Sequence, residues 1–406
     1  MNALFFAFLP FLNLGYGEYL SFQCALSLIV LWKFRRHLTA AVTKDRNLKL
    51  AVVASFYLSL LGNPSEDFIH DVLQISREGL MFVLIVSIVQ GAKGKNIERN
   101  LSSTEFFGLL MTIGISILLI SQEIYLSRGI YFGLPKEWFI GDPGTLPDKY
   151  ALLGQISGAG RALRPMGTFN EPSYCGFVLL SILLMFYRRM NSSIYCKTIV
   201  ALCLADALLL QSMSYVLAIV VIGYFSYVRK VDPRTKFWVL GVGAVLVGVI
   251  VYSGGLYQVI TRLSTITADY STTVRIFLPL ATLPIWILDH PLGFPGSSLE
   301  DALSQYLGPL GFLGGDILQN ALLDFLFLFG LCGLPALYLL LRSGSDISVK
   351  LYLLFSGIFN GSILSFDKFA VMCFAVCVYE SSKTQLALNS ARRAAYPTAK
   401  RYATSH

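Results

Sequence analysis

The sequence has little charge and few of the residues that build catalytic centres in soluble enzymes. Asp, Glu, Lys and Arg make up 14% of the 406 residues, whereas 55% are hydrophobic. Of the four histidines, none has a companion at metal-ligand spacing, which argues against a zinc site. The seven cysteines form no C-x-x-C pair and lie in or beside apolar runs, so we interpret them as packing residues.

Signals for nucleotide and nucleic-acid binding are missing as well. No glycine-rich phosphate loop followed by Lys-Ser or Lys-Thr occurs, and no predicted cytoplasmic segment is long enough for a nucleotide-binding domain, which excludes ATP hydrolysis by this chain alone. The net charge of +8 lies mainly in predicted cytoplasmic loops and the C-terminal tail. That placement suits contact with anionic membrane lipid, and no basic-aromatic motif indicates a nucleic-acid partner.

Long apolar runs dominate what is present and predict a polytopic membrane protein. At about twenty residues per span, they predict roughly eleven or twelve transmembrane helices. The runs lie near 2–16, 18–32, 48–62, 73–91, 104–122, 172–187, 198–211, 213–228, 237–256, 317–341, 351–365 and 369–383. Because they lack the alternation of barrel strands, the predicted fold is an all-α transmembrane domain over residues 1–383, followed by a basic cytoplasmic tail at 384–406.

Clusters of lysine and arginine predict which ends of the spans face the cytoplasm. They are Lys33 to Arg36, Lys93 to Arg99, Arg188-Arg189, Arg229 to Lys236, and Arg392 to Arg401. Two larger periplasmic segments result, at about 123–171 and 257–316. No Lys or Arg precedes Lys33, so the first 32 residues can hold one long span or two short ones. We interpret this N-terminal run as retained, because it has neither the basic start nor a convincing cleavage site of a signal peptide.

Four polar motifs interrupt the apolar pattern, and all of them fall on the predicted periplasmic side. In chain order they are Arg161-Ala-Leu-Arg164-Pro-Met-Gly-Thr-Phe-Asn-Glu171-Pro-Ser, then Ser212-Met-Ser214, then Ser271-Thr-Thr-Val-Arg275 with Trp286 and His290-Pro-Leu-Gly-Phe-Pro-Gly296, and finally Gln319-Asn320 followed after nine residues by Gly330-Leu-Cys-Gly333. Polar residues are rare in this apolar sequence, so we expect the catalytic site among these four motifs.

Taken together and in this order, the motifs resemble those of the bacterial O-antigen polymerase and ligase superfamily, the Wzy-type polymerases and their ligase relatives. The resemblance covers roughly residues 100–341, and the glutamate before Pro172 resembles the exopolysaccharide branch, which includes colanic-acid-type polymerases. It implies a GT-C-like, inverting glycosyltransferase of the bacterial inner membrane that uses no metal or other cofactor.

The resemblance also implies the substrates. The growing glycan would pass from undecaprenyl pyrophosphate to the non-reducing sugar of an incoming lipid-linked repeat unit, at the periplasmic face. The partners are then undecaprenyl-pyrophosphate-linked oligosaccharides and membrane lipid. Whether a chain-length regulator joins them stays open.

Two alternative functions stand beside the polymerase. An O-antigen-type ligase would carry histidine at the position of Gln319, so this residue argues against that function. A lipid-linked oligosaccharide flippase or another secondary transporter would also have about twelve spans, but it predicts related halves with broken helices. We find no internal repeat, and the polarity is concentrated on one side.

Arginines are the predicted partners of the leaving group, which would be a lipid pyrophosphate. The predicted periplasmic segments hold no cluster of Asp and Glu for a metal ion. A guanidinium keeps its charge and presents paired N–H donors to phosphate oxygens, so Arg164 and Arg275 are the predicted clamps. Arg161 and Arg262 flank the same loops and are weaker candidates for contacting glycan or the second pyrophosphate. The alternative is that such arginines only reach lipid headgroups.

An acceptor hydroxyl needs a general base, and Glu171 is the predicted one. The alternative is a carboxylate that merely stabilises a helix N-terminus. His290 is a second candidate base that contacts substrate, although a His-Pro-x-Gly turn favours a structural role.

Further polar residues near the last motif and within the spans complete the predicted site. Asp316 precedes Gln319 by three residues, so a continuous helix would put both on one face with Asn320 one turn after Asp316. They are predicted to line the cavity or to cap the span, and Ser214 is a weaker substrate contact. Arg77 and Glu78 lie in the run 73–91, where a central charge costs roughly 2.5–3.5 kcal/mol. Each is therefore expected to face a cavity or another helix rather than its neighbour.

Overall fold

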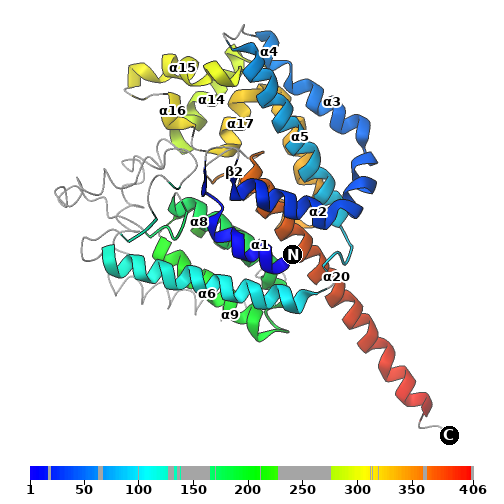
Figure 1. Ribbon diagram of the computed structural model, residues 1–406. Helices are drawn as coiled ribbons and strands as arrows, with labels where there is room; N and C mark the ends of the chain where they lie inside the picture. Colours follow the sequence, from blue (N-terminus) through cyan, green and yellow to red (C-terminus); the bar gives the residue numbers. More distant parts are fainter. Residues whose placement is uncertain are drawn as a thin grey trace.

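Most of the predicted apolar runs are helices in the computed structural model (Figure 1). The structure describes residues 1–16, 20–62, 67–98, 100–126, 132–134, 138, 165–169, 171–210, 212–226, 276–310, 312, 314–318, 320–359 and 364–403. The predicted span 237–256 lies outside these residues. Within them, β1 (Gly15–Tyr16) and β2 (Leu20–Ser21) form one short antiparallel hairpin, and the other regular elements are helices. The all-α fold class is confirmed.

The helices fall into three stretches of the chain. The first contains α1 (Asn2–Phe8), η1 (Leu9–Phe11), α2 (Phe22–Thr43), α3 (Arg46–Phe56), α4 (Ser59–Gly62), α5 (Phe68–Ala92) and α6 (Leu101–Leu126). The second contains α8 (Pro172–Phe186), η3 (Tyr187–Arg189), α9 (Ile194–Leu210) and α10 (Met213–Ser226). The third contains α14 (Leu278–Asp289), α15 (Gly296–Leu307), η6 (Gly308–Leu310), α16 (Gly314–Ile317), α17 (Ala321–Phe329), η7 (Gly330–Cys332), α18 (Gly333–Ser343), α19 (Ile347–Ser356) and α20 (Phe366–Ala403).

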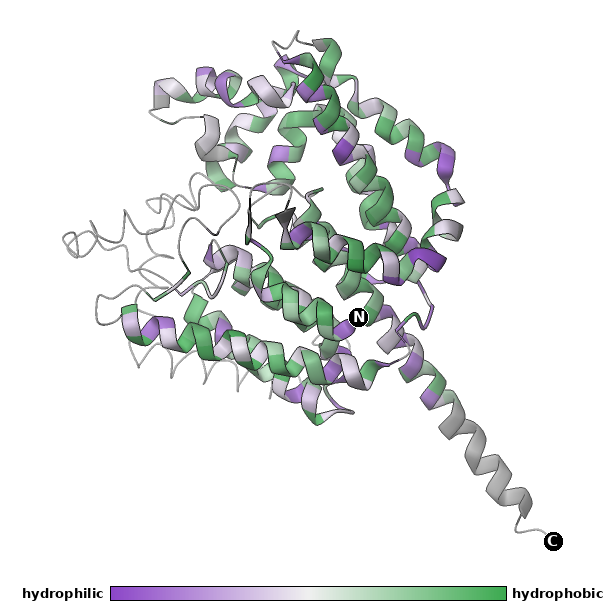
Figure 2. Cartoon of the chain, in the orientation of Figure 1, coloured by the Kyte–Doolittle hydropathy of each residue, from purple (hydrophilic) through white to green (hydrophobic). Residues whose placement is uncertain are grey.

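Three helical segments of the described chain are long and apolar enough to cross a membrane: α5, α6, and Ala321–Ser343, which comprises α17, η7 and α18. Shorter apolar helices occupy Asn2–Phe11, Ser214–Phe225, Leu278–Asp289 and Ile347–Ser356. Figure 2 shows the three long segments mostly in the hydrophobic colour, whereas α15 is paler and more polar. The chain is therefore a helical membrane protein, and the full number of crossings stays a prediction.

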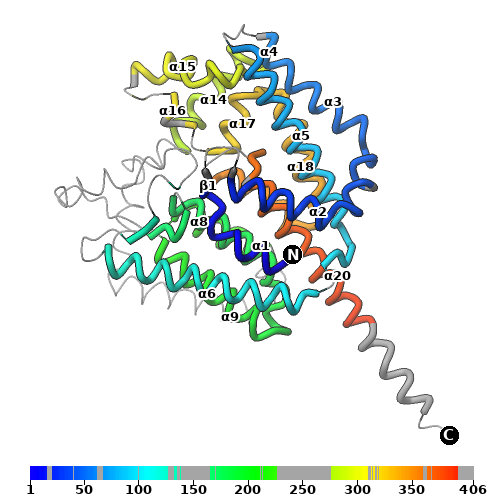
Figure 3. The backbone as a smooth tube through the Cα atoms, in the orientation of Figure 1, coloured from blue at the N-terminus to red at the C-terminus, as the bar shows by residue number. Residues whose placement is uncertain are grey.

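The core of the bundle gathers around α20. Every residue from Phe369 to Tyr379 is at most 1% exposed, and this part of α20 packs against α2, α5 and α8. The rings of Phe5 in α1 and Phe374 stack with centroids 3.7 Å apart. A helix that is apolar on all sides is typical of a buried position or a membrane span, and here neighbouring helices surround it. Figure 3 shows the coloured part of α20 leaving the bundle. The helix ends at Ala403, so it includes most of the predicted tail.

The N-terminal residues form two helical segments that run out and back. The β1–β2 hairpin separates α1 and η1 from α2, and the side chain of Asn2 accepts a hydrogen bond from the Lys33 ammonium. The beginning of α1 thus lies beside the second half of α2. The first 32 residues are therefore not one continuous helix, and whether each of the two segments crosses the membrane stays a prediction. The N-terminus lies on the side of Lys33, which the charge rule assigns to the cytoplasm.

Several predicted cytoplasmic clusters meet at this end of the bundle. Arg188 and Lys383 both pair with Asp346, at 3.0 and 3.2 Å. Burial raises the pKa of Asp346, but a hydrogen bond from Tyr379 and the two cations outweigh it, so the pKa lies below its usual range. Two further ion pairs join neighbouring segments: Lys33 with Glu98, and Arg189 with Glu105.

A second, smaller core holds α14 and α15 against α17. Trp286 is fully buried, and its indole N–H donates to the carbonyl oxygen of Phe327 at 3.1 Å. Leu299, Leu303 and Leu307 recur every four residues on the buried face of α15. We call residues 278–307 the α14–α15 cap. The sequence had predicted this region only as part of a periplasmic segment.

Candidate functional site

The N-terminal ends of α8, α17 and α20 meet at one end of the bundle, around the residues that follow α19. The Leu322 N–H donates to the carbonyl oxygen of Gly357 at 2.7 Å, and the Lys368 ammonium donates to that of Phe359 at 2.8 Å. The Phe359 ring lies 6.0 Å from the ring of Phe177 in α8. We call this meeting point the helix junction. Helix N-termini carry partial positive charge, so the junction suits an anionic group.

Glu171 is the N-cap residue of α8. Its backbone is extended, and Pro172 follows at the first helical position, where a missing N–H costs no hydrogen bond. The carboxylate does not cap the helix backbone; its Oε2 accepts a hydrogen bond of 2.9 Å from the Ser173 hydroxyl. The side chain is partly exposed. Glu171 therefore lies at the helix N-terminus, a position that is compatible both with the predicted base and with a carboxylate that stabilises the helix dipole.

One side chain fastens the segment before Glu171 to α6. Gln122 is 2% exposed, and its Oε1 accepts from the backbone N–H groups of Met166 and Gly167 at 3.0 and 2.8 Å. Its Nε2 donates to the Gly167 carbonyl oxygen at 2.8 Å. We call residues 165–171 the α8 loop. Three buried hydrogen bonds from one amide thus set the position from which the chain enters Glu171.

The His-Pro-Leu-Gly turn lies directly on the backbone that follows α17. Gly293 and Gly330 have φ angles of +91° and +51°, which other residues adopt only with strain. A methyl group on Gly330 would also come within 2.5 Å of the Pro291 carbonyl oxygen. Two motifs far apart in the sequence are therefore one structural unit. It is closed by two backbone hydrogen bonds of 2.9 Å, from Phe294 to Leu328 and from Leu331 to Pro291.

The His290 ring lies among aromatic side chains. Its centroid is 4.4 Å from that of Trp286 and 4.9 Å from that of Phe294. The Tyr306 hydroxyl lies 3.4 Å from Nε2 and donates to the Asp289 carboxylate at 2.8 Å. Burial lowers the pKa of His290 and the charge of Asp289 raises it, with burial the stronger, so the neutral ring is favoured. These contacts suit the structural role predicted for the turn.

Asn320 is the N-cap of α17 and is 4% exposed. Its Oδ1 accepts from the backbone N–H groups of Leu322 and Leu323 at 3.2 and 3.3 Å, so the capping alternative describes its geometry. The helix is interrupted between α16, which ends at Ile317, and α17, which begins at Ala321. The continuous helix that would have put Asp316 and Asn320 on one face does not form, and that prediction is wrong.

Ser214 lies in the first turn of α10, just after the tight turn predicted between two spans. The next residue is Tyr215. Tyr215 is fully buried, and its hydroxyl donates to the Cys203 carbonyl oxygen at 2.9 Å. A methyl group on Gly176 of α8 would lie 2.9 Å from the Tyr215 Cβ. This position therefore serves helix packing.

The remaining predicted site residues, Arg161, Arg164, Arg262, Arg275 and Gln319, lie outside the described residues. In the sequence, Arg164 directly precedes the α8 loop, and Arg275 directly precedes the segment that enters α14. Their convergence on one hollow stays a prediction.

Some polar residues near the junction were not singled out from the sequence. Asp324 of α17 interacts electrostatically with Lys368 of α20 and with Glu78 of α5. Glu78 and Lys368 are 2% and 0% exposed, and Gln74 donates to Glu78 at 3.3 Å. Glu78 faces other helices as predicted, whereas Arg77 is exposed on α5. A charge inside an apolar run is the signal that would have found Asp324.

Asp71 of α5 anchors the beginning of α15. It is fully buried, and its two carboxylate oxygens accept from the backbone N–H and the hydroxyl of Ser297, both at 2.8 Å. A carboxylate at a helix N-terminus is stabilised by the helix dipole. The two residues lie 226 positions apart, so no local sequence pattern announces this contact.

Comparisons with known proteins place these elements in a family. No curated protein and no solved structure matches the chain, and among the described residues no group of three or more His, Cys, Asp or Glu could hold a metal ion. The family model described as WcaD colanic acid polymerase matches residues 47–379, which include the α8 loop, the cap and the glycine pair. The match extends over far more than half of the sequence. The chain belongs to the WcaD colanic acid polymerase family.

Proposed function

We propose that this chain is a repeat-unit polymerase that works at the periplasmic face of the bacterial inner membrane. The donor is a glycan on undecaprenyl pyrophosphate, and the acceptor is a sugar hydroxyl of an incoming lipid-linked repeat unit. The acceptor oxygen attacks the anomeric carbon from the face opposite the pyrophosphate, which leaves with the bonding electron pair. The acceptor proton passes to a general base, and the anomeric configuration inverts. Membership of a polysaccharide polymerase family supports this reaction class.

The helix junction is the observation that carries the proposal. The start of α8 lies at the junction, and its other end leads into Arg188, where the predicted cytoplasmic charges pair. The junction is thus the end remote from that side. Three helix N-termini gather there, and their partial charges favour a departing pyrophosphate without the need for reorganisation.

In this proposal Glu171 is the general base. Its partial exposure lets an acceptor hydroxyl approach, and the Ser173 hydroxyl orients one carboxylate oxygen. A positioned base contributes about 10²- to 10⁴-fold to such a reaction. The α8 loop supports this role because Gln122 fixes the backbone that leads into Glu171.

Arg164 and Arg275 are the proposed pyrophosphate clamps. Their guanidinium groups would take the part that a divalent ion plays in other transferases with a diphosphate leaving group. Arg161 and Arg262 are proposed to contact glycan or the second pyrophosphate. Lysine cannot reproduce paired donation to phosphate oxygens, so it should restore function only in part.

The test of the reaction is the wild-type chain in nanodiscs supplied with lipid-linked repeat units alone. Lengthening of the glycan supports the polymerase. Transfer only after a lipid A core is added would identify a ligase, and movement of the lipid without a new glycosidic bond would identify a transporter.

The test of the clamps is Arg164→Ala and Arg275→Ala in cells, with Arg36→Ala, an exposed residue of the predicted cytoplasmic cluster, as the matched control. We expect both site variants to remain in the membrane and to accumulate single repeat units, while the control makes long chains. Polymer of normal length in both site variants would refute the assignment.

A further inference from the structure

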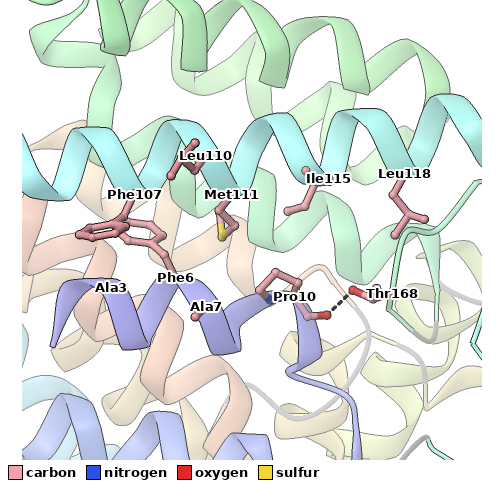
Figure 4. Close-up of a pocket in the computed structure, with 11 residues that line it drawn as sticks. Ala3, Phe6, Ala7, Pro10, Phe107, Leu110, Met111, Ile115, Leu118 and Thr168 are labelled. Carbon is pink, nitrogen blue, oxygen red and sulfur yellow. Dashed lines mark hydrogen bonds between the residues drawn. The ribbon is translucent and has the colours of Figure 1, made fainter.

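An open apolar groove runs between α1 and α6 (Figure 4). Its volume is about 520 Å³, within the range of small-molecule sites. On the α6 side it is lined by one helix face, which carries Phe107, Met111, Gly114 and Leu118 at intervals of three and four residues. Phe6 and Ala7 face them from α1. Apart from Thr168, the lining residues are apolar or glycine.

The α8 loop closes one end of this groove. The Thr168 hydroxyl donates a hydrogen bond to the carbonyl oxygen of Pro10, as Figure 4 shows. Gln122, which holds the loop, lies one turn beyond Leu118 on the same helix. The groove therefore ends at the loop that leads into Glu171, the proposed general base.

We propose that the groove holds the isoprenoid chain of the lipid-linked substrate, an inference that rests on the proposed function. A chain whose pyrophosphate sits beside the α8 loop must continue into hydrocarbon, and the groove offers an apolar path that starts at that loop. Its α6 wall from Phe107 to Leu118 is about 16 Å long, roughly half of the hydrocarbon core. The small residues Ala7 and Gly114 leave the recess that a methyl-branched chain fills.

Gly114 is the position at which the groove can be filled without disturbing the helices. A Cβ atom there meets no other atom within 4 Å, so the ring of Gly114→Phe enters empty groove. Gly108 on the same helix is unsuitable, because its Cβ would lie 2.7 Å from the Phe186 ring. Ile120→Phe is the matched control, since Ile120 is 49% exposed on a different face of α6.

The experiment uses the full chain in nanodiscs of phosphatidylethanolamine and phosphatidylglycerol. The probe is a polyprenyl pyrophosphate that carries a benzophenone on its chain, and labelled peptides are mapped after irradiation. We expect labels on α1 and α6, a roughly tenfold loss of labelling in Gly114→Phe because buried isoprene units are displaced, and no loss in Ile120→Phe. Undecaprenyl pyrophosphate should compete with the probe, whereas a phospholipid in excess should not.

Two results would overturn the inference: equal labelling of the groove in Gly114→Phe and wild type, or equal competition by phospholipid, which would make the groove a site for bilayer acyl chains. Labelling needs no turnover, so it separates this inference from the proposed function. A wild-type chain that is labelled in the groove but never lengthens glycan would contradict the polymerase alone. A chain that lengthens glycan with Gly114→Phe as efficient as wild type at limiting substrate would contradict the groove alone.

Discussion

The α8 loop and the α14–α15 cap both carry motifs on which the resemblance to known polymerases depends, yet they are held in place by different means. The α8 loop is fastened by the side chain of one residue, Gln122, through three hydrogen bonds to its backbone. The cap is fastened by backbone against backbone at Gly293 and Gly330, with Asp71 anchoring the start of α15. A side-chain fastening is removed by substituting one residue, whereas the backbone contact is lost only when one of the two glycines gains a side chain.

The two fastenings accompany different expected roles for Glu171 in the α8 loop and His290 in the cap. Glu171 is partly exposed at the end of the α8 loop, as a group that must receive a proton requires. His290 is also partly exposed, but its ring packs among the aromatic side chains of Trp286, Phe294 and Tyr306. We therefore expect the α8 loop to act on substrate and the cap to shape the surroundings.

The largest expected effect comes from a direct comparison of the two candidate bases. Glu171→Gln keeps the size and the hydrogen bond from Ser173 but cannot accept a proton at neutral pH, so we expect lengthening of purified lipid-linked repeats to fall by about 10²- to 10⁴-fold. His290→Ala should keep measurable turnover. Full activity in Glu171→Gln would show that Glu171 is not the general base. Equal losses of activity in both variants would show that the α8 loop and the cap do not differ in their catalytic role.

A smaller but still severe effect is expected where the cap meets the backbone after α17. Gly293→Ala combines a left-handed φ of +91° with a methyl group that would collide with the Leu328 carbonyl oxygen, so it should destabilise the docked cap by more than about 3 kcal/mol. Limited proteolysis between α14 and α16 measures the loss. Gly308→Ala is the control, because a Cβ there meets nothing within 4 Å. Equal protease resistance in both variants would show that the close approach does not hold the cap.

The sequence predicted the all-α fold class correctly, because burial in lipid dictates composition over many residues, while the number of spans stays a prediction. It predicted that the His-Pro-x-Gly and Gly-x-x-Gly motifs matter, but not that they touch, since contact between distant segments leaves no local pattern. Gln122 and Asp71 were missed for the same reason, because each bonds to the backbone of a remote segment. The continuous helix through Asp316 was wrong although a local signal was available, since asparagine is a preferred N-cap and Asn320 starts a new helix.

An intermediate effect is expected from releasing the α8 loop. Gln122→Leu keeps the bulk of the side chain but leaves the Met166 and Gly167 N–H groups without their acceptor, at a cost of about 2–3 kcal/mol. Glu171 would then be misplaced, so turnover should fall by roughly ten- to a hundredfold. Kinetics on purified protein measure this, with Ser121→Ala, whose hydroxyl bonds only within α6, as the control. Wild-type turnover in Gln122→Leu would mean that the loop is positioned by other contacts.

The smallest expected effect is a pH dependence confined to the cap. Burial lowers the pKa of His290 from the ordinary value of 6.5, so in acid the undocked cap binds more protons than the docked one. The stabilisation from the neutral ring is complete above pH 6.5 and is lost as the pH falls through the folded pKa. Hydrogen exchange between about pH 5 and pH 8, corrected for the intrinsic rate, should therefore show faster opening of α14 and α15 in acid.

The control variant is His290→Phe, which keeps an aromatic ring among Trp286, Phe294 and Tyr306 and should abolish the pH dependence. The first turn of α8 should show no such pH dependence. If α8 opens in parallel with the cap, or if the variant keeps the trend, the titrating group lies elsewhere and the two regions are coupled more tightly than their fastenings suggest.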